Sequence, residues 1–367
     1  MSICTFSGCD NKARRRGFCD KHRQDESIVA ASEQVAADRA RLHLVRELAT
    51  VKERYKAALK TIEQLESEQH ALQTLKDNID IVEVKPHYGS GTSEATPVIL
   101  ASDWHIEESV GAEVSGLNHY TLDIAQERVT KFFQGSLRLV QLLNKDVAIH
   151  TVVLGLLGDY ITNDIHGAEN AEKNQLQPTH AIVTAQNMII SGLECWLDNS
   201  DYTFVIVCKV GNHGRTTITT RFAAENGHSL EFLMYLTLQA YFRNEPRVQF
   251  VIDDGYHSYL DVYDRTIRFH HGHAIRYAGG VGGIFIPTYK AIAQWNKGRT
   301  VNLDVFGHFH QMKDGGNFIC NGSLIGWNAF ANSIKADYEI PMQTLFLIDK
   351  KRGRTATWPI MVGEGKR

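Results

Sequence analysis

The stretch TVVLGLLGD (151–159) is an unbroken apolar run that ends in Gly158 and Asp159. A run of this kind predicts a buried strand, and the polar residue after it predicts a functional loop at the strand's carboxyl end. The same arrangement recurs along the chain in VILASDWH (98–105) and in TFVIVCKVGNH (203–213). The sequence therefore places Asp, Asn and His repeatedly at predicted strand ends.

Two histidine-rich motifs follow, His271-Gly272-His273 and Gly307-His308-Phe309-His310. Taken one at a time, each motif is as easily a turn or a loop around a buried histidine. Taken together, five motifs occur in the fixed order D-x-H, GD, GNH, HGH and GHxH. Two metal ions need about seven or eight protein donors from separate strand ends, and this series supplies them. The pattern therefore predicts a centre for two divalent metals.

Composition limits the classes of protein to consider. The chain has 367 residues, of which 43% are hydrophobic and 22% charged, which is typical of a globular protein of two or three units. Its formal net charge of −3 gives no global basic field of the kind that attracts nucleic acid. The sequence shows no apolar run long enough to span a bilayer and no secretion signal at its start. We therefore expect a cytoplasmic protein without membrane contact.

Residues 1–25 carry a metal-ligand pattern of their own. Three cysteines and one histidine follow the spacing C-x4-C-x9-C-x2-H, which suits tetrahedral zinc: Cys4, Cys9, Cys19 and His22. A segment this short cannot bury a core, so one structural Zn²⁺ would explain how it folds. The alternative is an unfolded tail with coincidental cysteines. Basic residues between the ligands form a local patch that could contact phosphates, or simply a soluble surface.

Residues 26–80 predict one long helix without Pro or Gly. Apolar residues step by four and three along it, as in a heptad seam: Leu44, Leu48, Val51, Tyr55, Ala58, Ile62, Leu65 and Leu72. The pattern predicts a coiled coil that joins copies of the chain into a homo-oligomer. The alternative is a single amphipathic helix lying on the rest of the protein. Residues 81–96 are rich in Pro, Gly, Ser and Thr and predict a linker.

Residues 97–367 alternate short apolar strands with amphipathic helices. Helices are expected near 121–143, 171–196 and 228–242, and the part after about residue 246 is richer in strands. This pattern predicts an α/β domain with the five motifs at its strand ends.

The five motifs together resemble the calcineurin-like metallophosphoesterase superfamily, over about residues 97–330. The sequence GNHGR (211–215) is similar to that of the phage-encoded, Mre11/SbcD-like members. The N-terminal segment resembles the Cys3His zinc segments of phage-encoded endonucleases. The resemblance implies a four-layer α/β/β/α sandwich that holds two metals between the strand ends of its two sheets. For a phage-encoded protein the expected location is the host cytoplasm.

The resemblance also implies a role for each motif residue. Asp103, His105 and His310 would bind the first metal, and Asp159 would bridge both metals. Asn212, His271 and His308 would bind the second metal, with His270 and His273 as alternatives to His271. His213 would donate a proton to the leaving oxygen or contact the phosphoryl group. Mixed oxygen and nitrogen ligands suit Mn²⁺, with Fe²⁺ and Zn²⁺ as alternatives.

One departure from the family pattern concerns the third motif. The family usually has Asp or Glu after the histidine, whereas here Gly214 and Arg215 follow it. The partner of His213 must then come from elsewhere, and Arg215 could clamp a phosphate through two hydrogen bonds.

The resemblance implies a metal-dependent phosphoester hydrolase that uses a metal-bound hydroxide, and we expect a nuclease acting on DNA. The alternatives are a phosphomonoesterase, a phosphodiesterase for small molecules or cyclic nucleotides, and a non-catalytic DNA-binding scaffold.

Overall fold

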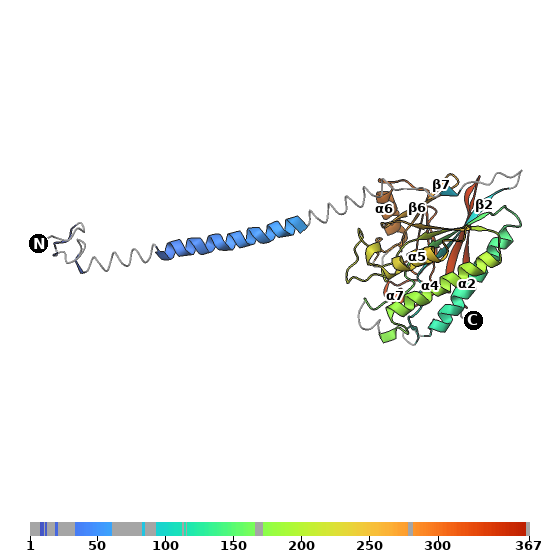
Figure 1. Ribbon diagram of the computed structural model, residues 1–367, viewed down its shortest axis with the longest axis horizontal. Helices are drawn as coiled ribbons and strands as arrows, with labels where there is room; N and C mark the ends of the chain where they lie inside the picture. Colours follow the sequence, from blue (N-terminus) through green and yellow to red (C-terminus); the bar gives the residue numbers. More distant parts are fainter. Residues whose placement is uncertain are drawn as a thin grey trace. The chain divides into compact units, whose positions relative to one another are not determined.

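The computed structural model of the chain describes residues 8–10, 12, 19–20, 34–60, 83–84, 93–111, 114, 116–165, 172–277 and 282–364. The chain divides into two compact units, Met1–Thr74 and Leu75–Arg367. Figure 1 shows both, coloured along the sequence. No described helix is both long and apolar enough to cross a membrane.

The first unit contains a helix over residues 34–60, within the predicted coiled-coil stretch. The apolar side chains of the predicted seam that lie in it are exposed in the single chain: Leu44, Leu48, Val51 and Tyr55. Ile62, Leu65 and Leu72 lie outside the described residues, as do the predicted zinc ligands Cys4 and His22. The other two predicted zinc ligands, Cys9 and Cys19, have their Sγ atoms 3.8 Å apart.

The second unit is built on two sheets of six strands each. The first sheet has four parallel strands, β2 (Ala95–Ala101), β3 (Thr151–Leu156), β4 (Thr203–Cys208) and β5 (Val248–Ile252). Two antiparallel strands extend it beyond β2, namely β11 (Met342–Asp349) and β12 (Gly353–Met361). Because β2, β3 and β4 are parallel, the first three motifs all lie at one edge of this sheet.

The second sheet has the strand order β1-β6-β7-β8-β10-β9. Its strands are β1 (Glu83–Val84), β6 (Ser258–Val262), β7 (Arg265–Phe269), β8 (Leu303–Phe306), β9 (Lys313–Asp314) and β10 (Phe318–Cys320). Strands β7 and β8 are parallel neighbours, so the fourth and fifth motifs follow them at the same edge. The short strand β1 pairs with β6.

Three apolar clusters order the layers. The first lies between one face of the first sheet and three helices, α2 (Leu122–Leu143), α4 (Pro178–Asp198) and α5 (Leu230–Tyr241). The second joins the two sheets, with Leu100 and Val153 from one sheet and Ile267 and Val305 from the other. The third packs α6 (Phe285–Trp295) against the second sheet through Ile292 and Phe306.

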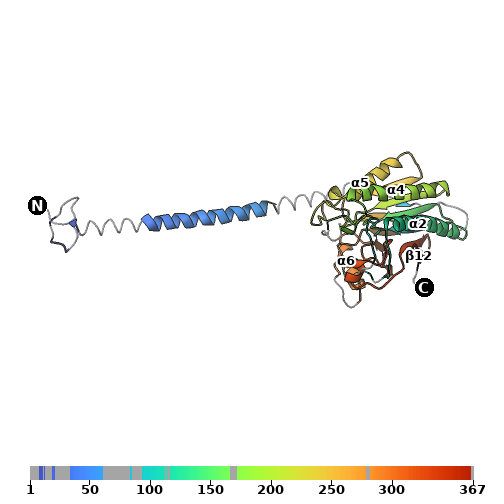
Figure 2. The same cartoon turned by 90° about the horizontal axis from the view of Figure 1, so that it is seen from below.

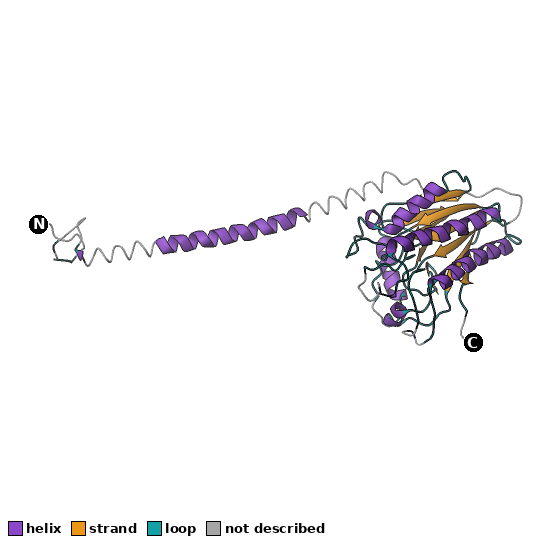
Figure 3. Cartoon of the chain, turned by 60° about the horizontal axis from the view of Figure 1, so that its bottom comes forward, coloured by secondary structure: helices purple, strands orange, loops and turns teal. Residues whose placement is uncertain are grey.

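The layers are therefore helices, sheet, sheet and helix. In Figure 2, α4 and α5 lie toward the top of this unit and α6 toward the bottom, and Figure 3 shows helices lying over the strands. Two short helices, η2 (Asn226–His228) and α7 (Ala329–Ser333), lie in connecting segments.

The prediction of an α/β domain is confirmed, and its strands form two multi-stranded sheets. Two parts of the stretch predicted as a linker, 81–96, belong to these sheets: β1 and the start of β2. Ala95 and Thr96 are fully buried, so the folded unit begins upstream of Pro97. Helix α6 was not predicted, because its eleven residues follow a glycine-rich stretch and give too short a periodic pattern.

Candidate metal centre

The structure brings the side chains of all five motifs together. Three groups of side chains have potential ligand atoms within 4.8 Å of one another: Asp103, His105 and His310; His105, Asp159 and His213; Asp159, His271 and His308. The first group is the set expected for one metal, and the third contains Asp159 with two of the residues expected for the other, His271 and His308. Asp159 also belongs to the second group, which it shares with His105 of the first set.

These residues have an unusual backbone conformation. Among the described residues, eight that are not glycine have a positive φ, and five of these are candidate ligands: Asp103, His105, Asp159, His308 and His310. Their φ angles lie between 47° and 71°, in the left-handed region that side chains with a Cβ seldom adopt. Such conformations cost about 1–3 kcal/mol each and persist where the surroundings impose them. The strain is concentrated where the donors converge.

Hydrogen bonds fix Asp103 between the two sheets. Its carboxylate accepts hydrogen bonds from Ser102 Oγ at 2.5 Å and from the backbone N–H of His308 at 3.0 Å. Its backbone oxygen accepts from the N–H groups of Leu324 and Ile325. The first and fifth motifs are thus joined directly. Close packing requires Gly307, since a Cβ there would lie 2.3 Å from the Asp103 carboxylate.

A short chain of hydrogen bonds orients His105. Its Nδ1 lies 3.0 Å from Thr162 Oγ1, and Thr162 Oγ1 donates to Glu108 Oε2 at 3.0 Å. With Nδ1 occupied, Nε2 is the nitrogen left for a metal. Within the described part of the chain, His105 Nε2 is buried and has no hydrogen-bond partner, and the same holds for His310 Nδ1. An unpaired buried nitrogen is costly unless a ligand occupies its lone pair.

Asp159 and His271 form a buried pair. His271 Nε2 lies 2.9 Å from Asp159 Oδ2 and 3.2 Å from Asn212 Oδ1, and its Nδ1 lies 2.6 Å from the backbone oxygen of Leu157. Burial lowers the pKa of His271, but the adjacent Asp159 carboxylate outweighs burial and raises this pKa to about 10. Without a metal, the imidazolium therefore supplies the positive charge beside Asp159.

The other candidate ligands have protonation states suited to a metal. Burial lowers the pKa of His310 to about 3 and the pKa values of His105 and His308 well below their usual range, so all three are neutral near pH 7. Burial raises the pKa of Asp103 to about 7, although the nearby His271 lowers it, so this buried carboxyl is only partly ionised near pH 7. Neutral imidazoles beside a buried carboxyl group are a donor set that a divalent cation would complete.

His213 stands beside this donor set. Its backbone N–H donates to Asp159 Oδ1 at 2.8 Å, and its ring Nδ1 lies 2.8 Å from the backbone oxygen of Thr162. The rings of His213 and His105 are in edge contact, with centroids 4.8 Å apart. The sequence left the partner of His213 open, and the Thr162 carbonyl is one such partner.

Arg215 donates hydrogen bonds within the loop that follows the third motif. Its guanidinium donates to the backbone oxygens of Asn212, Thr217 and Ile218, and the residue is largely buried. These hydrogen bonds lie within the segment from Asn212 to Ile218 and stabilise its conformation. In this geometry the side chain shapes the loop.

The two alternatives to His271, His270 and His273, lie against other acidic residues. His270 stacks on Phe306 with ring centroids 5.0 Å apart, and its Nε2 lies 3.4 Å from Asp304, which also pairs with the buried Arg268. His273 Nε2 lies 2.8 Å from Glu225 Oε1. Of the three histidines, only His271 belongs to a group of potential metal ligands among the described residues.

Two buried acids near the centre were not singled out from the sequence. Glu107 Oε1 accepts hydrogen bonds from the backbone N–H groups of Thr162 and Asn163, at 2.7 and 2.8 Å. Glu231, in the first turn of α5, accepts from the N–H groups of Tyr160 and Gly211. The position of Glu107 two residues after His105 was a signal that could have been used. Glu231 carries no comparable signal, because its partners are distant in sequence.

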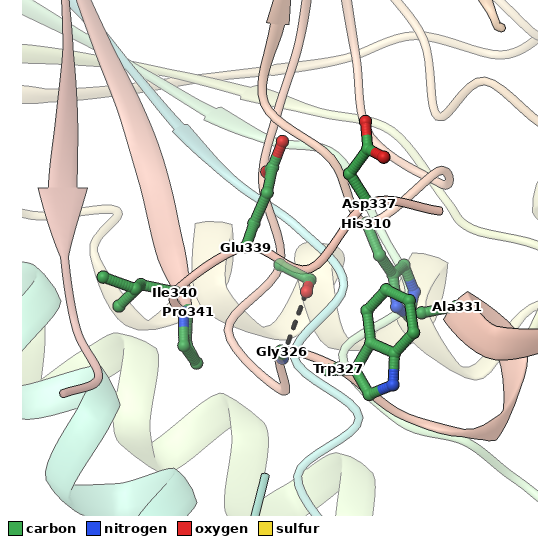
Figure 4. Close-up of a pocket in the computed structure, with 9 residues that line it drawn as sticks. His310, Gly326, Trp327, Ala331, Asp337, Glu339, Ile340 and Pro341 are labelled. Atoms are coloured by element: carbon green, nitrogen blue, oxygen red, sulfur yellow. Dashed lines mark hydrogen bonds between the residues drawn. The ribbon is translucent and has the colours of Figure 1, made fainter. Parts of the chain in front are cut away.

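A small pocket adjoins the centre at His310. It has a cavity volume of about 10 Å³ and is lined by Trp327, Asp337 and Glu339, among other residues. Figure 4 shows these side chains around the pocket, with the hydrogen bond from Gly326 N–H to Ser323 Oγ beside them. Sites for drug-sized ligands usually have about 300–1,000 Å³. The pocket is therefore smaller than a typical ligand site.

Comparisons with known proteins add little. No protein-family model and no curated protein matches the sequence. Three solved structures align distantly: a candidate 5′-nucleotidase from Staphylococcus aureus (8% identity, 74% of this chain and 55% of that chain, TM-score 0.30), Vps29 from Chaetomium thermophilum (10%, 72% and 96%, 0.27), and the calcineurin-like phosphoesterase YfkN from Bacillus subtilis (10%, 74% and 91%, 0.28). The chain spans little more than half the length of the nucleotidase. These TM-scores are too low to indicate a shared fold.

Proposed function

We propose that this chain is a phosphoester hydrolase of the calcineurin-like metallophosphoesterase type, which uses two divalent metals, and that it cleaves DNA. The observation that carries the proposal is the convergence of the donors. Seven side chains from five separate segments offer ligand atoms in three overlapping groups, and Asp159 lies in two of them. Neutral imidazoles and carboxylates in this arrangement fit two cations side by side.

Asp103, His105 and His310 would hold one metal, Asn212, His271 and His308 the other, and Asp159 would serve both. Such a pair of metals activates water and neutralises phosphate oxygens. Oxygen and nitrogen ligands without thiolate favour Mn²⁺, with Fe²⁺ or Zn²⁺ as alternatives.

The chain's own residues support the reaction in two ways. The Thr162 carbonyl holds Nδ1 of His213, so Nε2 is the ring nitrogen that can transfer a proton to the leaving oxygen. Thr162 also holds His105 through its hydroxyl, so a single residue orients the proton donor and a metal ligand. A shared support keeps their separation constant during the reaction.

One feature at the rim favours a nucleic acid over a small phosphomonoester. Phe222 is 48% exposed, and its ring stacks on His273 at 5.3 Å with an interplanar angle of 8°. His273 in turn lies near His271 and His308, with ring centroids 5.5 and 6.3 Å away. Exposed aromatic rings stack on bases in proteins that bind single strands, and each contributes about 1–3 kcal/mol. Phe222 would contact a base next to the cleaved phosphate.

The test is hydrolysis by the full chain with Mn²⁺. The substrates are labelled single- and double-stranded DNA, p-nitrophenyl phosphate and bis-p-nitrophenyl phosphate, and Asp159→Asn is the inactive control. We expect cleavage of DNA and of the diester, with loss of about 100-fold or more in Asp159→Asn. Cleavage of the monoester with intact DNA would instead identify a phosphomonoesterase. Turnover that survives Asp159→Asn would reject the metal centre.

We further propose that the first unit serves assembly and structure. The exposed apolar seam at Leu44, Leu48, Val51 and Tyr55 has the heptad spacing of a coiled coil, which would join a second copy of the chain. The 3.8 Å between Cys9 Sγ and Cys19 Sγ equals the spacing of about 3.8 Å expected for two thiolates on one tetrahedral zinc. Zinc analysis of the wild type and of Cys9→Ser tests that site, with one Zn²⁺ lost in the variant.

A further inference from the structure

Glu231 is a fully buried acid whose two carboxyl oxygens hold two different loops. Its Oε1 accepts the backbone N–H of Tyr160 at 2.8 Å, and its Oε2 accepts the backbone N–H of Gly211 at 2.7 Å. Tyr160 directly follows Asp159, and Gly211 directly precedes Asn212. The acid thus reaches from α5 to the two loops that present these candidate ligands.

The two loops lie in close contact with each other. A Cβ on Gly158 would lie 2.1 Å from the Gly211 nitrogen, and a Cβ on Gly211 would lie 2.1 Å from Asp159 Oδ1. Because the loops approach this closely, their spacing depends on packing at Gly158 and Gly211 and on the groups that bind both loops. Glu231 is a group that binds both.

The missing side chain at Gly214 makes room for this acid. A Cβ on Gly214 would lie 2.7 Å from Glu231 Cγ and 2.9 Å from Glu231 Cδ, which is closer than real Cβ contacts allow. The Gly214 backbone oxygen also accepts the N–H of Leu230 at 2.8 Å, so the start of α5 is bonded to the loop after His213. Gly214 and Glu231 therefore share one small space.

We propose that Glu231 is a positioning residue of the metal centre: it holds the loops of Asp159 and Asn212 at the separation that two cations need, and Gly214 leaves the space for it. The inference rests on the proposed metal centre. Helix α5 carries none of the five motifs. Through Glu231 it would nevertheless control the distance between ligands from two of these motifs, Asp159 and Asn212.

The test measures Mn²⁺ binding to the full chain by titration calorimetry, with circular dichroism and thermal melting to verify folding. Glu231→Ala removes both acceptors, and Glu231→Gln keeps one. We expect Mn²⁺ affinity to fall by about 10–100-fold in Glu231→Ala, which is the usual effect of losing a group that orients ligands, and by less in Glu231→Gln. Unchanged affinity in folded Glu231→Ala, within about twofold, would overturn the inference.

Asp349 provides a matched control. It is also a buried acid that accepts two backbone N–H groups, those of Lys351 and Arg352 at 2.9 and 2.8 Å. It pairs with Ala95 at the start of β2, whereas the metal loops follow the opposite ends of the strands. Asp349→Ala should lower the melting temperature and leave Mn²⁺ affinity unchanged. Equal losses of affinity in Asp349→Ala and Glu231→Ala would mean that general destabilisation is the cause, and the inference would fall.

A double-mutant cycle tests the shared space. Gly214→Ala alone forces Glu231 away and should weaken Mn²⁺ binding, whereas adding it to Glu231→Ala should cause no further loss. Additive losses would contradict the proposed coupling.

If the wild-type chain bound no Mn²⁺, Fe²⁺ or Zn²⁺, both the proposed function and this inference would fail. If the wild type bound and hydrolysed normally and Glu231→Ala did the same, only the inference would fail.

Discussion

The backbone oxygen of Thr162 lies 2.8 Å from Nδ1 of His213, which makes a main-chain carbonyl a partner of this histidine. A carbonyl accepts a hydrogen bond from either the neutral or the charged ring and carries no charge of its own. It therefore orients His213 without adding a negative charge next to Asp159 and Asp103, whose carboxylates already lie close together.

If His213 donates a proton to the leaving oxygen, its removal should matter most for poor leaving groups. We expect His213→Ala to lower kcat by about 10²–10⁴-fold on a phenyl or DNA diester. The loss should be much smaller on bis-p-nitrophenyl phosphate, whose leaving group needs little protonation. Steady-state rates on both substrates give the comparison. A loss of Mn²⁺ binding in this variant would show instead that His213 serves mainly as a ligand.

Two roles are considered for Arg215: it supports the loop after the third motif, or it clamps a phosphate. Its contacts with the oxygens of Asn212, Thr217 and Ile218 predict that it organises the loop. Arg215→Lys keeps the charge but loses the fork of donors, so we expect a loss of about 1–3 kcal/mol in the free energy of unfolding. Denaturant unfolding of the metal-free protein measures it. Unchanged stability together with a raised KM would favour the phosphate clamp.

The metal-free protein should lose stability as the pH rises from 6.5 to 8. Burial raises the pKa of Glu231 from 4.5 to about 8, so the folded state holds a proton that the unfolded state has released. Such a group stabilises the fold fully below pH 4.5, and this contribution is lost as the pH rises toward 8. Each extra proton held by the folded state gives a slope of about 1.4 kcal/mol per pH unit.

His271, with its pKa raised to about 10 by Asp159 against the effect of burial, adds to the loss above pH 6.5. The three histidines with lowered pKa values, His105, His308 and His310, change the stability in the opposite direction, but only below pH 6.5. They therefore do not contribute between pH 6.5 and 8. Melting temperatures in EDTA measure the slope. Glu231→Gln should make the slope shallower, and an unaltered slope would show that Glu231 does not titrate there.

The helix over residues 34–60 should determine the oligomeric state. Leu48 and Val51 occupy the predicted seam. The double variant Leu48→Asp with Val51→Asp, or removal of residues 1–80, should therefore lower the number of chains per particle, which light scattering measures. Leu42 is 55% exposed and lies off the seam, which makes Leu42→Asp the matched control. The same number of chains per particle in all variants would reject the coiled coil.

Much of the second unit could be predicted because its signals are local. An apolar run followed by a polar loop identifies β2, β3 and β4, and parallel pairing then brings Asp103, Asp159 and Asn212 to one edge. Strand β1 escaped prediction because two residues carry no periodicity and pair with β6 across most of the domain. The same holds for Glu231, whose role depends on contacts with Tyr160 and Gly211 that no spacing in the sequence reveals.

The sequence by itself determined which side chains gather, since residue type and strand-end position are local properties of the chain. Only the tertiary structure decided how those side chains are held. The left-handed backbone at Asp103, Asp159 and His308, the carbonyl behind His213 and the acid behind Gly211 all arise from contacts between distant segments. Such contacts form when the sheets and α5 pack, because a strained or buried polar group is stable only where neighbouring elements supply its partners.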